Sequence, residues 1–382
     1  MINREVSVKV IKYAKQYPVV TITGPRQSGK TTLSKTLFPR KKYASLEAME
    51  IRDHASSDPK GFLAQFPEGA VLDEIQRAPQ LTSYIQGIVD EKNKPGMFIL
   101  TGSQSFELMT SLSQSLAGRM AIVKLLPFTL KEAYKEPGKQ KIEEVLYRGL
   151  YPRIHDKKLN PTEASSFYTS TYVERDIRSI LKVQDLLRFE TFLKLCAGRT
   201  GQVLNLSSLG NDCGISHNTA KSWITLLEAS FIVKLLPTYH VNIKKRLVKS
   251  PKLYFLDSGL AAFLMGINDA DQIASHPLRG NLFETLVFAE LLKARYNTGK
   301  PENLYFFRDS NGNEVDFIIE EGNTLGCYEA KAAATISSDM FKGLFFFAKN
   351  MDKDTVQSII YGGDESYERK GVNVQAWHSR IS

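Results

Sequence analysis

The chain of 382 residues has little cysteine and lacks the long apolar runs found in membrane proteins. Its three cysteines, Cys196, Cys213 and Cys327, are too far apart for a zinc-binding spacing or a disulfide framework. No apolar run approaches the ~20 residues that span a bilayer. Charged residues near the start, such as Arg4 and Glu5, exclude a secretory signal. These absences predict a cytoplasmic protein with no membrane partner.

The sequence also lacks internal repeats and low-complexity segments. Because 382 residues exceed what one hydrophobic core usually fills, two or three domains are expected. The formal net charge of +9 favours a polyanionic partner such as DNA or RNA, although many basic proteins bind neither.

Strand and helix patterns alternate over roughly the first 130 residues, which is typical of a parallel sheet covered by helices. We predict an α/β fold with a sheet domain at 1–135, a helical and winged-helix domain at 145–265, and a further α/β domain at 275–382. A polar, lysine-rich stretch at 136–144 marks the first boundary. Buried strands of the first domain are expected at 19–23, 70–72, 97–100 and 121–126.

A glycine-rich loop follows the first of these strands and precedes a helical pattern. It fits the P-loop pattern GxxxxGK(S/T), whose backbone N–H groups surround phosphate oxygens while the following helix adds its positive end. Lys30 is expected to reach the β- and γ-phosphates of ATP, and the Thr31 hydroxyl to bind Mg²⁺. A chance glycine turn would require neither the strand before it nor the helix after it. The predicted nucleotide-binding residues here are Gly24, Pro25, Arg26, Gln27, Ser28, Gly29, Lys30, Thr31 and Thr32.

The strand expected at 70–72 leads into Asp73 and Glu74. In an ATPase, Asp73 would hold Mg²⁺ through water, and Glu74 would polarise the attacking water as a general base. The alternative is an acidic strand end that caps the next helix. The position about 40 residues after the P-loop favours the ATPase interpretation.

Two further positions could act on the γ-phosphate. The strand expected at 97–100 runs into Thr101, Ser103 and Gln104, which could position water or could simply form a turn. Among these, we include Ser103 with the nucleotide-binding candidates. Arg119 could act as an arginine finger on the nucleotide of a neighbouring subunit in a homo-oligomer, or could be a surface arginine.

Residues 18 to 130 resemble the AAA-superfamily ATP-binding proteins of bacteria and archaea, and in particular a group with a C-terminal domain of unknown function. The resemblance continues through Tyr172–Asp176 to about Ala332. It implies an AAA-type sheet and ATP hydrolysis, and no established cellular role. The motifs that carry it are Gly24–Thr31, Leu72–Gln76, Leu100–Ser103 and Leu116–Arg119.

Residues 207–234 have the pattern of a helix, a tight turn and a second helix. Gly214 is expected in the turn, and Ser216 is expected to cap the second helix. Helical spacing divides the second helix into two faces. The apolar face consists of Ala220, Trp223, Ile224 and Leu227, and the polar face of His217, Asn218, Lys221 and Ser222.

In a DNA-binding version of this motif, the polar face would lie in the major groove. A hairpin expected at 239–256 carries basic residues that could bind phosphates, as in a winged helix. The alternative is a protein-contact module with an ordinary solvated surface. The basic residues of the hairpin are Lys244, Lys245, Arg246, Lys249 and Lys252.

The last domain is expected to begin with an amphipathic helix that carries Glu284. Strands at 305–308 and 314–319 follow, joined by a turn with Asn311 and Gly312. Strand alternation places Glu329 and Lys331 of a further strand on the same face. It also directs Val315 and Phe317 to one face of their strand, and Glu314, Asp316 and Ile318 to the other.

These acidic residues could form a metal centre. Glu284, Asp316 and Glu329 offer the oxygen ligands that Mg²⁺ prefers, and Lys331 could activate water for phosphodiester hydrolysis. The order of the four residues resembles the PD-(D/E)xK nuclease superfamily, which implies a restriction-endonuclease-like domain. An ordinary charged surface, or a nuclease fold that has lost its activity, is the alternative.

The leading hypothesis is therefore a Mg²⁺-dependent ATPase whose nucleotide state controls a nucleic-acid-associated C-terminal half. A nucleotide-gated regulatory module that contacts a protein partner and has an inactive nuclease-like fold is the second hypothesis. A small-molecule kinase ranks below both, because Glu74 beside Asp73 suits attack by water better than attack by a specific phosphoryl acceptor.

Overall fold

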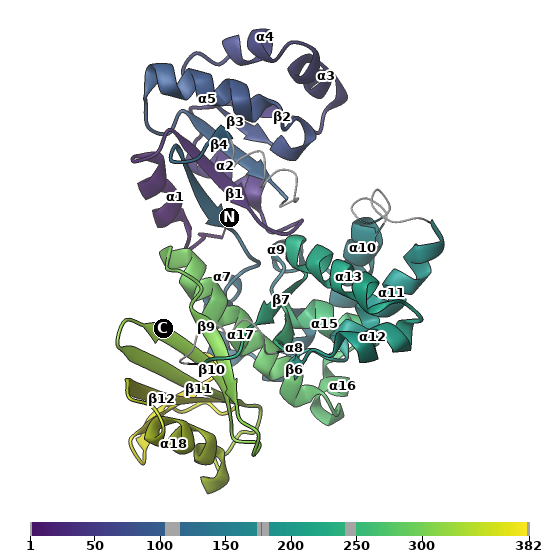
Figure 1. Cartoon of the computed structure of the whole chain (residues 1–382), viewed down its shortest axis with the longest axis vertical. Coiled ribbons are helices and arrows are strands. Elements are labelled where there is room, and N and C mark those ends of the chain that lie inside the picture. The colour runs from purple at the N-terminus through teal and green to yellow at the C-terminus, as the bar shows by residue number, and fades with distance from the viewer. Residues whose placement is uncertain (1, 104–114, 174–176, 178–182, 241–249, 380–382) are drawn as a thin grey trace. The chain divides into compact units, whose positions relative to one another are not determined.

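The computed structural model describes residues 2–103, 115–173, 177, 183–240 and 250–379 (Figure 1). The chain divides into two compact units. Among the described residues, no helix is both long enough and apolar enough to cross a membrane. The first unit comprises Met1–Phe128, Ala229–Phe231 and Arg295–Pro301, and the second comprises Thr129–Glu228, Ile232–Ala294 and Glu302–Ser382.

The first unit is built on a five-stranded parallel sheet with the strand order β2-β3-β4-β1-β5. The predicted parallel sheet is thus confirmed, and all four predicted strands are present within a few residues. Strand β2, which has only one fully buried residue, was not predicted. The strands are β1 (Val19–Thr23), β2 (Lys42–Ser45), β3 (Ala70–Asp73), β4 (Phe98–Gly102) and β5 (Met120–Lys124).

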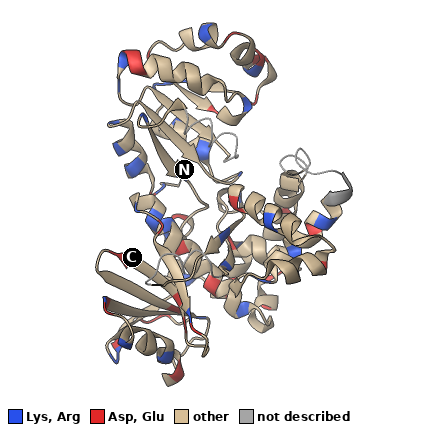
Figure 2. Cartoon of the chain, in the orientation of Figure 1, with Lys and Arg blue, Asp and Glu red and all other residues tan. Residues whose placement is uncertain are grey.

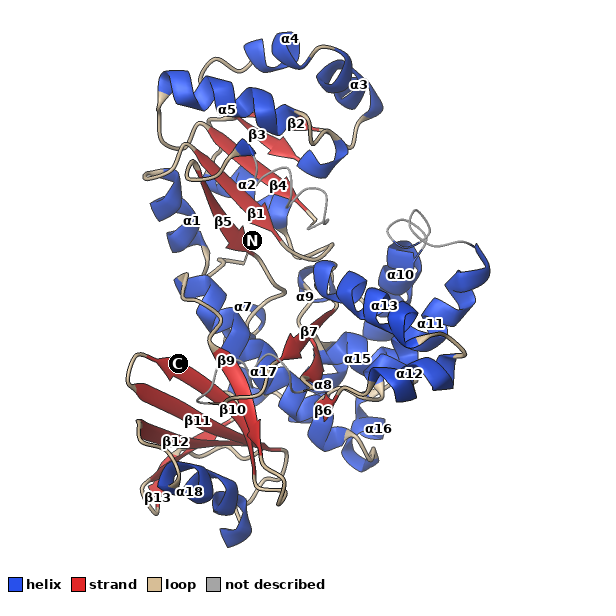
Figure 3. Cartoon of the chain, viewed as in Figure 1, coloured by secondary structure: helices blue, strands red, loops and turns tan. Residues whose placement is uncertain are grey.

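Helices cover both faces of this sheet (Figure 3). Alternate strand residues supply the two cores, because neighbouring side chains point to opposite faces. Val20 and Val71 pack with residues of α1 and α2, whereas Val19 and Leu72 pack with residues of α3, α4 and α5. The helices are α1 (Ser7–Ala14), α2 (Lys30–Leu37), α3 (Met49–Ser57), α4 (Pro59–Ala64) and α5 (Leu81–Lys92), with a short 3₁₀ turn at Ile75–Arg77.

The second unit begins with a helical region, as predicted. A three-stranded antiparallel sheet lies within it, in the order β6-β8-β7. Its strands are β6 (Gln202–Val203), β7 (Val233–Leu236) and β8 (Lys252–Phe255). The helices are α7 (Leu130–Ala133), α8 (Ile142–Arg148), α9 (Pro152–Asp156), α10 (Pro161–Tyr172), α11 (Val183–Ala197), α12 (Leu206–Cys213), α13 (His217–Ala229), α15 (Ser258–Leu264) and α16 (Ala270–Ser275).

Helices α12 and α13 form the predicted helix, turn and helix. Gly214 takes the turn with φ of 63°, and the Ser216 hydroxyl accepts a hydrogen bond from the Thr219 N–H at 3.1 Å. The predicted apolar face of α13 is buried, and Trp223 packs edge-on against Phe189 and Phe192 of α11. The sequence therefore places this motif correctly, including its turn and its cap.

A six-stranded mixed sheet ends the second unit, in the order β13-β14-β12-β11-β10-β9. Its three predicted strands are present, and β9 and β10 pair as the predicted hairpin. Helix α18 packs on one face of the sheet, through the core that contains Leu344 and Phe347. The elements are α17 (Arg279–Thr298), β9 (Leu304–Arg308), β10 (Glu314–Glu321), β11 (Thr324–Lys331), α18 (Lys342–Lys349), β12 (Asp354–Tyr361), β13 (Tyr367–Arg369) and β14 (Val372–Ala376).

The predicted alternation along β10 is wrong after Asp316. The register of β10 against β9 shifts between Val315 and Ile318, which indicates a bulge. Val315 and Ile318 consequently share the core on the α18 side, whereas Phe317 packs against Tyr254 and Phe288. An extra residue in the strand reverses which face of the sheet each later side chain points to. A strict alternation of faces along the sequence cannot predict such a bulge.

Candidate functional site

The P-loop connects β1 to α2 and carries a buried lysine. Lys30 is the first residue of α2, and its ammonium donates to the carbonyl oxygens of Gly24 at 2.9 Å and Pro25 at 2.7 Å. Gly24 has to be glycine, because a Cβ atom there would overlap the Leu125 carbonyl. The loop is thus folded tightly around the lysine that is expected to bind phosphate.

The other predicted loop residues differ in exposure. Ser28 is buried, and its hydroxyl has no hydrogen-bond partner within the part of the chain that the structure describes. Pro25 is buried and Arg26 is half-buried, whereas Gln27 and Thr32 are exposed. Gln27 and Gly29 both have positive φ values, of 59° and 93°. A buried hydroxyl without a partner, in a loop of this shape, fits a polar ligand such as a phosphate group.

Arg4 supports this loop from outside the predicted motif. Its guanidinium donates to the Ser28 carbonyl at 2.8 Å and to the Leu126 carbonyl at 2.7 Å, and it lies over the Phe128 ring. These bonds connect the loop to the segment that follows β5. The sequence pattern contains no signal for this role, because Arg4 lies far from the motif along the chain.

Asp73 ends β3, and its carboxylate accepts hydrogen bonds from three hydroxyl groups. Thr31 donates at 2.9 to 3.0 Å, Tyr43 of β2 at 2.7 Å, and Thr101 of β4 in a further short bond. Asp73 is buried, with 4% of its surface exposed. Burial, together with the bond to Asp73, raises the pKa of Tyr43. The structure thus brings together Thr31 and Asp73, which were predicted to bind the Mg²⁺ of the nucleotide, and adds Tyr43, which the sequence analysis did not identify.

Glu74 follows with a left-handed backbone, at φ of 60° and ψ of 46°. The side-chain N–H₂ of Gln76 donates to the Glu74 carboxylate, and also to the Ser103 hydroxyl at 3.0 Å. The side-chain amide oxygen of Gln76, Oε1, is buried and has no hydrogen-bond partner among the described residues. Gln76 therefore links the predicted general base to the end of β4. Gln104, another candidate, lies outside the described residues.

Thr31 and Asp73 provide the hard oxygen donors that Mg²⁺ prefers, so the residues present fit a magnesium nucleotide. Lys30 and the P-loop backbone provide the matching positive groups for its phosphates.

Arg119 lies just before β5 and pairs with Asp90 of α5. Its Nη2 atom lies 2.9 Å from Asp90 Oδ2, and Nε makes a second bond to the same carboxylate. This pairing raises the pKa of Arg119 and lowers the pKa of Asp90. The predicted finger role of Arg119 concerns a neighbouring subunit and stays a prediction.

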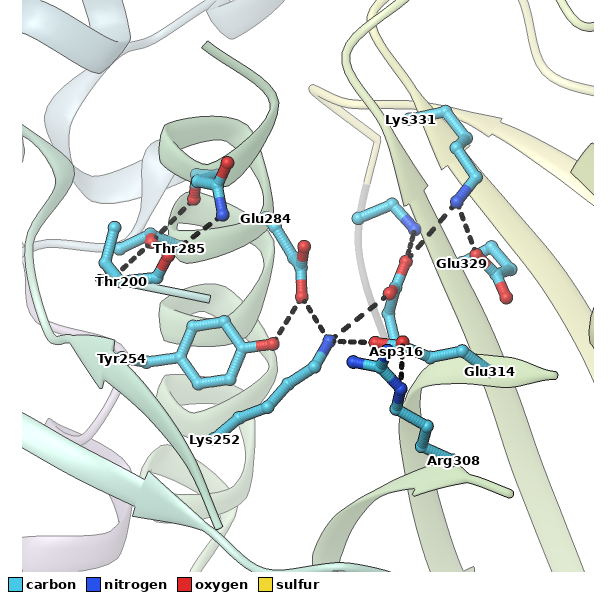
Figure 4. Close-up of polar contacts among 12 residues, drawn as sticks. Thr200, Lys252, Tyr254, Glu284, Thr285, Arg308, Glu314, Asp316, Glu329 and Lys331 are labelled. Carbon is cyan, nitrogen blue, oxygen red and sulfur yellow. Dashed lines mark hydrogen bonds and ion pairs between the residues drawn. The ribbon is translucent and has the colours of Figure 1, made fainter. Parts of the chain in front are cut away.

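The second predicted site lies in the second unit (Figure 4). Lys331 Nζ lies 2.6 Å from Glu329 Oε2 and 3.6 Å from Asp316 Oδ2, and the Ala330 N–H donates to Asp316 at 3.0 Å. Burial, then the neighbouring Asp316, raises the pKa of Glu329 well above its ordinary value. Lys331 and Lys252, together with hydrogen bonds to the carboxylate, hold the pKa of Asp316 below its ordinary value, although burial alone would raise it. The structure thus brings three of the four predicted residues together on β10 and β11.

Glu284, the fourth residue, faces this group from α17 and contacts a lysine instead. Lys252 Nζ lies 2.9 Å from Glu284 Oε1, and the Tyr254 hydroxyl donates to the same oxygen. Burial and Asp316 raise the pKa of Glu284 to about 7. Among the described residues, no three His, Cys, Asp or Glu side chains come together as a group that could hold a metal ion.

The expected position of Lys252 on a phosphate-binding hairpin needs correction. Lys252 is 3% exposed and pairs with Glu284, Glu314 and Asp316, because β8 directs it toward α17 and β10. The four other basic residues of that hairpin, Lys244, Lys245, Arg246 and Lys249, lie outside the described residues.

The polar face predicted for α13 is exposed at His217, Asn218, Lys221 and Ser222. Lysine and arginine occur in both units, among aspartate and glutamate (Figure 2). The net charge of +9 nevertheless lies almost entirely in the first unit, because basic and acidic residues nearly balance in the second. This exposure leaves the polar face of α13 available to a partner. Its side chains could bind either a nucleic acid or a protein, so they do not identify the kind of partner.

The parallel sheet, the loop between β1 and α2, and the acidic end of β3 define a P-loop nucleotide-binding domain. Residues 16–134 match a family described as an AAA domain, which supports an AAA-type P-loop protein. Residues 139–271 and 279–379 match two families that are each described as a domain of unknown function.

Two curated relatives share much of the chain. An uncharacterized protein of Mycobacterium tuberculosis is 28% identical over 341 residues, which cover 88% of this chain and 75% of the relative. An uncharacterized protein of Haemophilus influenzae is 25% identical over 272 residues, which cover 67% of this chain and 63% of the relative. The similarity thus extends through both units.

Among solved structures, the Walker-type ATPase of Pyrococcus abyssi aligns with a TM-score of 0.48 and 17% identity, over 69% of this chain and 96% of that protein. The AMPPCP-bound DnaA of Aquifex aeolicus aligns with a TM-score of 0.29 and 16% identity, over 58% of this chain and 85% of that protein.

Proposed function

We propose that this chain hydrolyses ATP with Mg²⁺ at the P-loop, and that the nucleotide state controls its C-terminal half. The observation that carries the first part is the contact between Thr31 and Asp73, beside Glu74. A strand end that only capped a helix would not need to reach the first turn of α2. We place the protein in the cytoplasm, because its three cysteines are buried and free.

Each residue of this nucleotide site then has a defined role. Lys30 would exchange the carbonyl oxygens of Gly24 and Pro25 for phosphate oxygens, and Thr31 and Asp73 would hold Mg²⁺. Held there, Mg²⁺ would supply positive charge to neutralise the charge that develops on the transferred phosphoryl group. Glu74 would accept a proton from the attacking water, with Gln76 fixing the direction of its carboxylate. Arg119 would act in trans if the protein forms a homo-oligomer.

Two variants test this function. Lys30→Ala is expected to abolish ATP binding, because the positive charge at the phosphates is removed. Glu74→Gln is expected to retain ATP binding and to slow hydrolysis by on the order of 10² or more, because only the general base is removed. Equal turnover by Glu74→Gln and the unmodified protein would exclude the general-base role. Nucleotide binding and single-turnover hydrolysis, measured separately, distinguish the two effects.

For the C-terminal half, we propose a winged-helix module over 145–265 and a nuclease-like module over 275–382, after the ATPase domain at 1–135. Helices α12 and α13 with the β6-β8-β7 sheet support the first module. The exposed polar face of α13 supports contact with DNA or RNA. Hydrolysis of ATP would change how strongly this face binds nucleic acid.

A second candidate function is a nucleotide-gated regulatory module that binds a protein and has an inactive nuclease-like fold. The presence of Lys252 among the carboxylates favours it over DNA or RNA cleavage. Cleavage of single- and double-stranded DNA and RNA with Mn²⁺ and ATP decides between these functions. Cutting that disappears with Asp316→Ala would support a nuclease, and no cutting of any substrate would support the regulatory module.

A further inference from the structure

A buried ammonium group lies inside the carboxylate cluster of the second unit (Figure 4). Lys252 Nζ lies 2.5 Å from Glu314 Oε1, 2.9 Å from Glu284 Oε1 and 3.6 Å from Asp316 Oδ1. The three carboxylates come from α17 and β10, whereas the lysine comes from β8. One ammonium therefore bridges carboxylates from two different elements.

Local structure directs Lys252 into this position. Lys252 and Tyr254 lie two residues apart on β8, so both point to the same face of the strand. The Tyr254 ring stacks on Phe288 of α17 at 4.4 Å between centroids and also contacts Phe317 of β10. These aromatic contacts fix β8 against α17 and β10, and they leave the ammonium facing the carboxylates.

The position matters for metal binding. A divalent ion bound by both Glu284 and Asp316 would have to lie between their oxygens, at about 2.0 to 2.6 Å from each. The Lys252 ammonium already contacts Oε1 of Glu284 and Oδ1 of Asp316. The ammonium and the metal ion would therefore compete for the same oxygens.

Further cations surround the cluster. Lys331 contacts Glu329 and Asp316, and the Arg308 guanidinium lies 3.7 Å from Glu314. Four carboxyl groups thus face three side-chain cations. Carboxylates that already have cationic partners attract a divalent ion less strongly than free ones.

We propose that the Lys252 ammonium is the built-in cation of this cluster, occupying the position where Glu284 and Asp316 would otherwise bind a divalent metal. In this arrangement the cluster joins β8 to α17 and β10 as an ion-pair network, and it does not support metal-dependent phosphodiester cleavage. The proposal concerns the second unit and does not depend on ATP hydrolysis.

Manganese binding to the full-length protein tests this. All samples carry Asp73→Asn, so that the P-loop does not contribute metal binding, and free Mn²⁺ is measured by electron paramagnetic resonance. With Lys252 present, no Mn²⁺ is expected to bind through Asp316. Lys252→Met is expected to create one Mn²⁺ site, and adding Asp316→Asn is expected to remove it. Lys353→Met, which removes a lysine paired with Glu320 elsewhere in the same sheet, should create none.

Thermal unfolding provides a second measurement. Lys252→Met should lower Tm in EDTA, because it leaves buried carboxylates unpaired, and Mn²⁺ should restore much of the decrease. Lys252→Gln, which retains a hydrogen-bond donor, provides a milder variant if Lys252→Met does not fold. Mn²⁺ binding that requires Asp316 while Lys252 is present would overturn the proposal. A folded Lys252 variant that gains no Mn²⁺ site would overturn it as well.

Discussion

The Thr31 hydroxyl lies 2.9 Å from Asp73 Oδ2, although the two residues are 42 positions apart in the chain. The contact places the first turn of α2 against the end of β3, where Tyr43 and Thr101 also reach the same carboxylate. Asp73 is thus held in one orientation by hydroxyl groups from three elements.

This orientation leads to a prediction about Mg²⁺. Asp73→Asn retains the shape and an acceptor oxygen for Thr31 but removes the negative charge. It is expected to reduce Mg²⁺-dependent ATP hydrolysis by on the order of a hundredfold. A fluorescent ATP analogue should bind this variant about equally in Mg²⁺ and in EDTA. Tyr43→Phe, which removes one hydroxyl and no charge, is the control. If Asp73→Asn retains Mg²⁺-dependent ATP hydrolysis, as Tyr43→Phe is expected to, Asp73 does not bind the Mg²⁺ ion.

Gln76 is expected to act as a positioning residue for Glu74. Gln76→Leu removes the donor to the Glu74 carboxylate and to Ser103, so kcat should fall by roughly tenfold while nucleotide affinity is retained. In a Glu74→Gln background the same change should have little further effect, because the group that it positions is absent. Gln80→Leu, at an exposed glutamine nearby, is the matched control. A decrease in kcat that is the same in both backgrounds would assign Gln76 a purely structural role.

The exposed face of α13 can be tested through salt dependence. Lys221→Ala should weaken DNA or RNA binding and reduce the slope of log K against log salt by roughly 0.9 for each duplex phosphate that the protein no longer neutralises. Lys194→Ala removes an exposed lysine from α11 and serves as the control. Equal slopes for the two variants and the unmodified protein would place Lys221 on an ordinary solvated surface.

His155 gives a pH-dependent prediction. Its Nε2 atom lies 2.8 Å from the Gly149 carbonyl, which can only accept, so Nε2 carries the proton. Burial lowers the pKa of His155 from its ordinary value of 6.5. The unfolded chain therefore binds this proton more tightly than the folded protein does. The contribution of His155 to stability is fully present above about pH 6.5 and is lost as the pH falls through the folded pKa.

His155→Gln removes this titration while retaining an N–H donor. The free energy of unfolding, measured with urea at about pH 7.5 and about pH 5.5, should therefore fall less with acid in the variant than in the unmodified protein. If the free energy of unfolding changes equally with pH in both proteins, His155 does not contribute to the pH dependence of stability.

The P-loop, the acidic end of β3 and the turn at Gly214 could be predicted because each depends on a few neighbouring residues. A glycine loop between an apolar strand and a helix has one common geometry, and so does Gly214 followed by a Ser216 cap. Strand β2 was missed because only Ala44 among its residues is fully buried, so no apolar run marks it.

The C-terminal cluster was predicted only in part. Periodicity places Glu329 and Lys331 together, since both lie on the same strand. The position of Lys252 depends on how β8 packs against α17, and the bulge in β10 depends on its pairing with β9. The first depends on contacts between segments separated in the chain, and the second on how the two strands of one hairpin pair, so neither follows from a residue pattern.

The Lys252 cluster limits how these sequences can be recombined. The cation belongs to the region matched at 139–271, whereas Glu284, Glu314 and Asp316 belong to the region matched at 279–379. A chimaera that took the second region from this chain without β8 would leave those carboxylates without their ammonium. Grafted or shuffled proteins of this kind therefore have to inherit the lysine and its acidic partners as one unit, or supply another cation in its place.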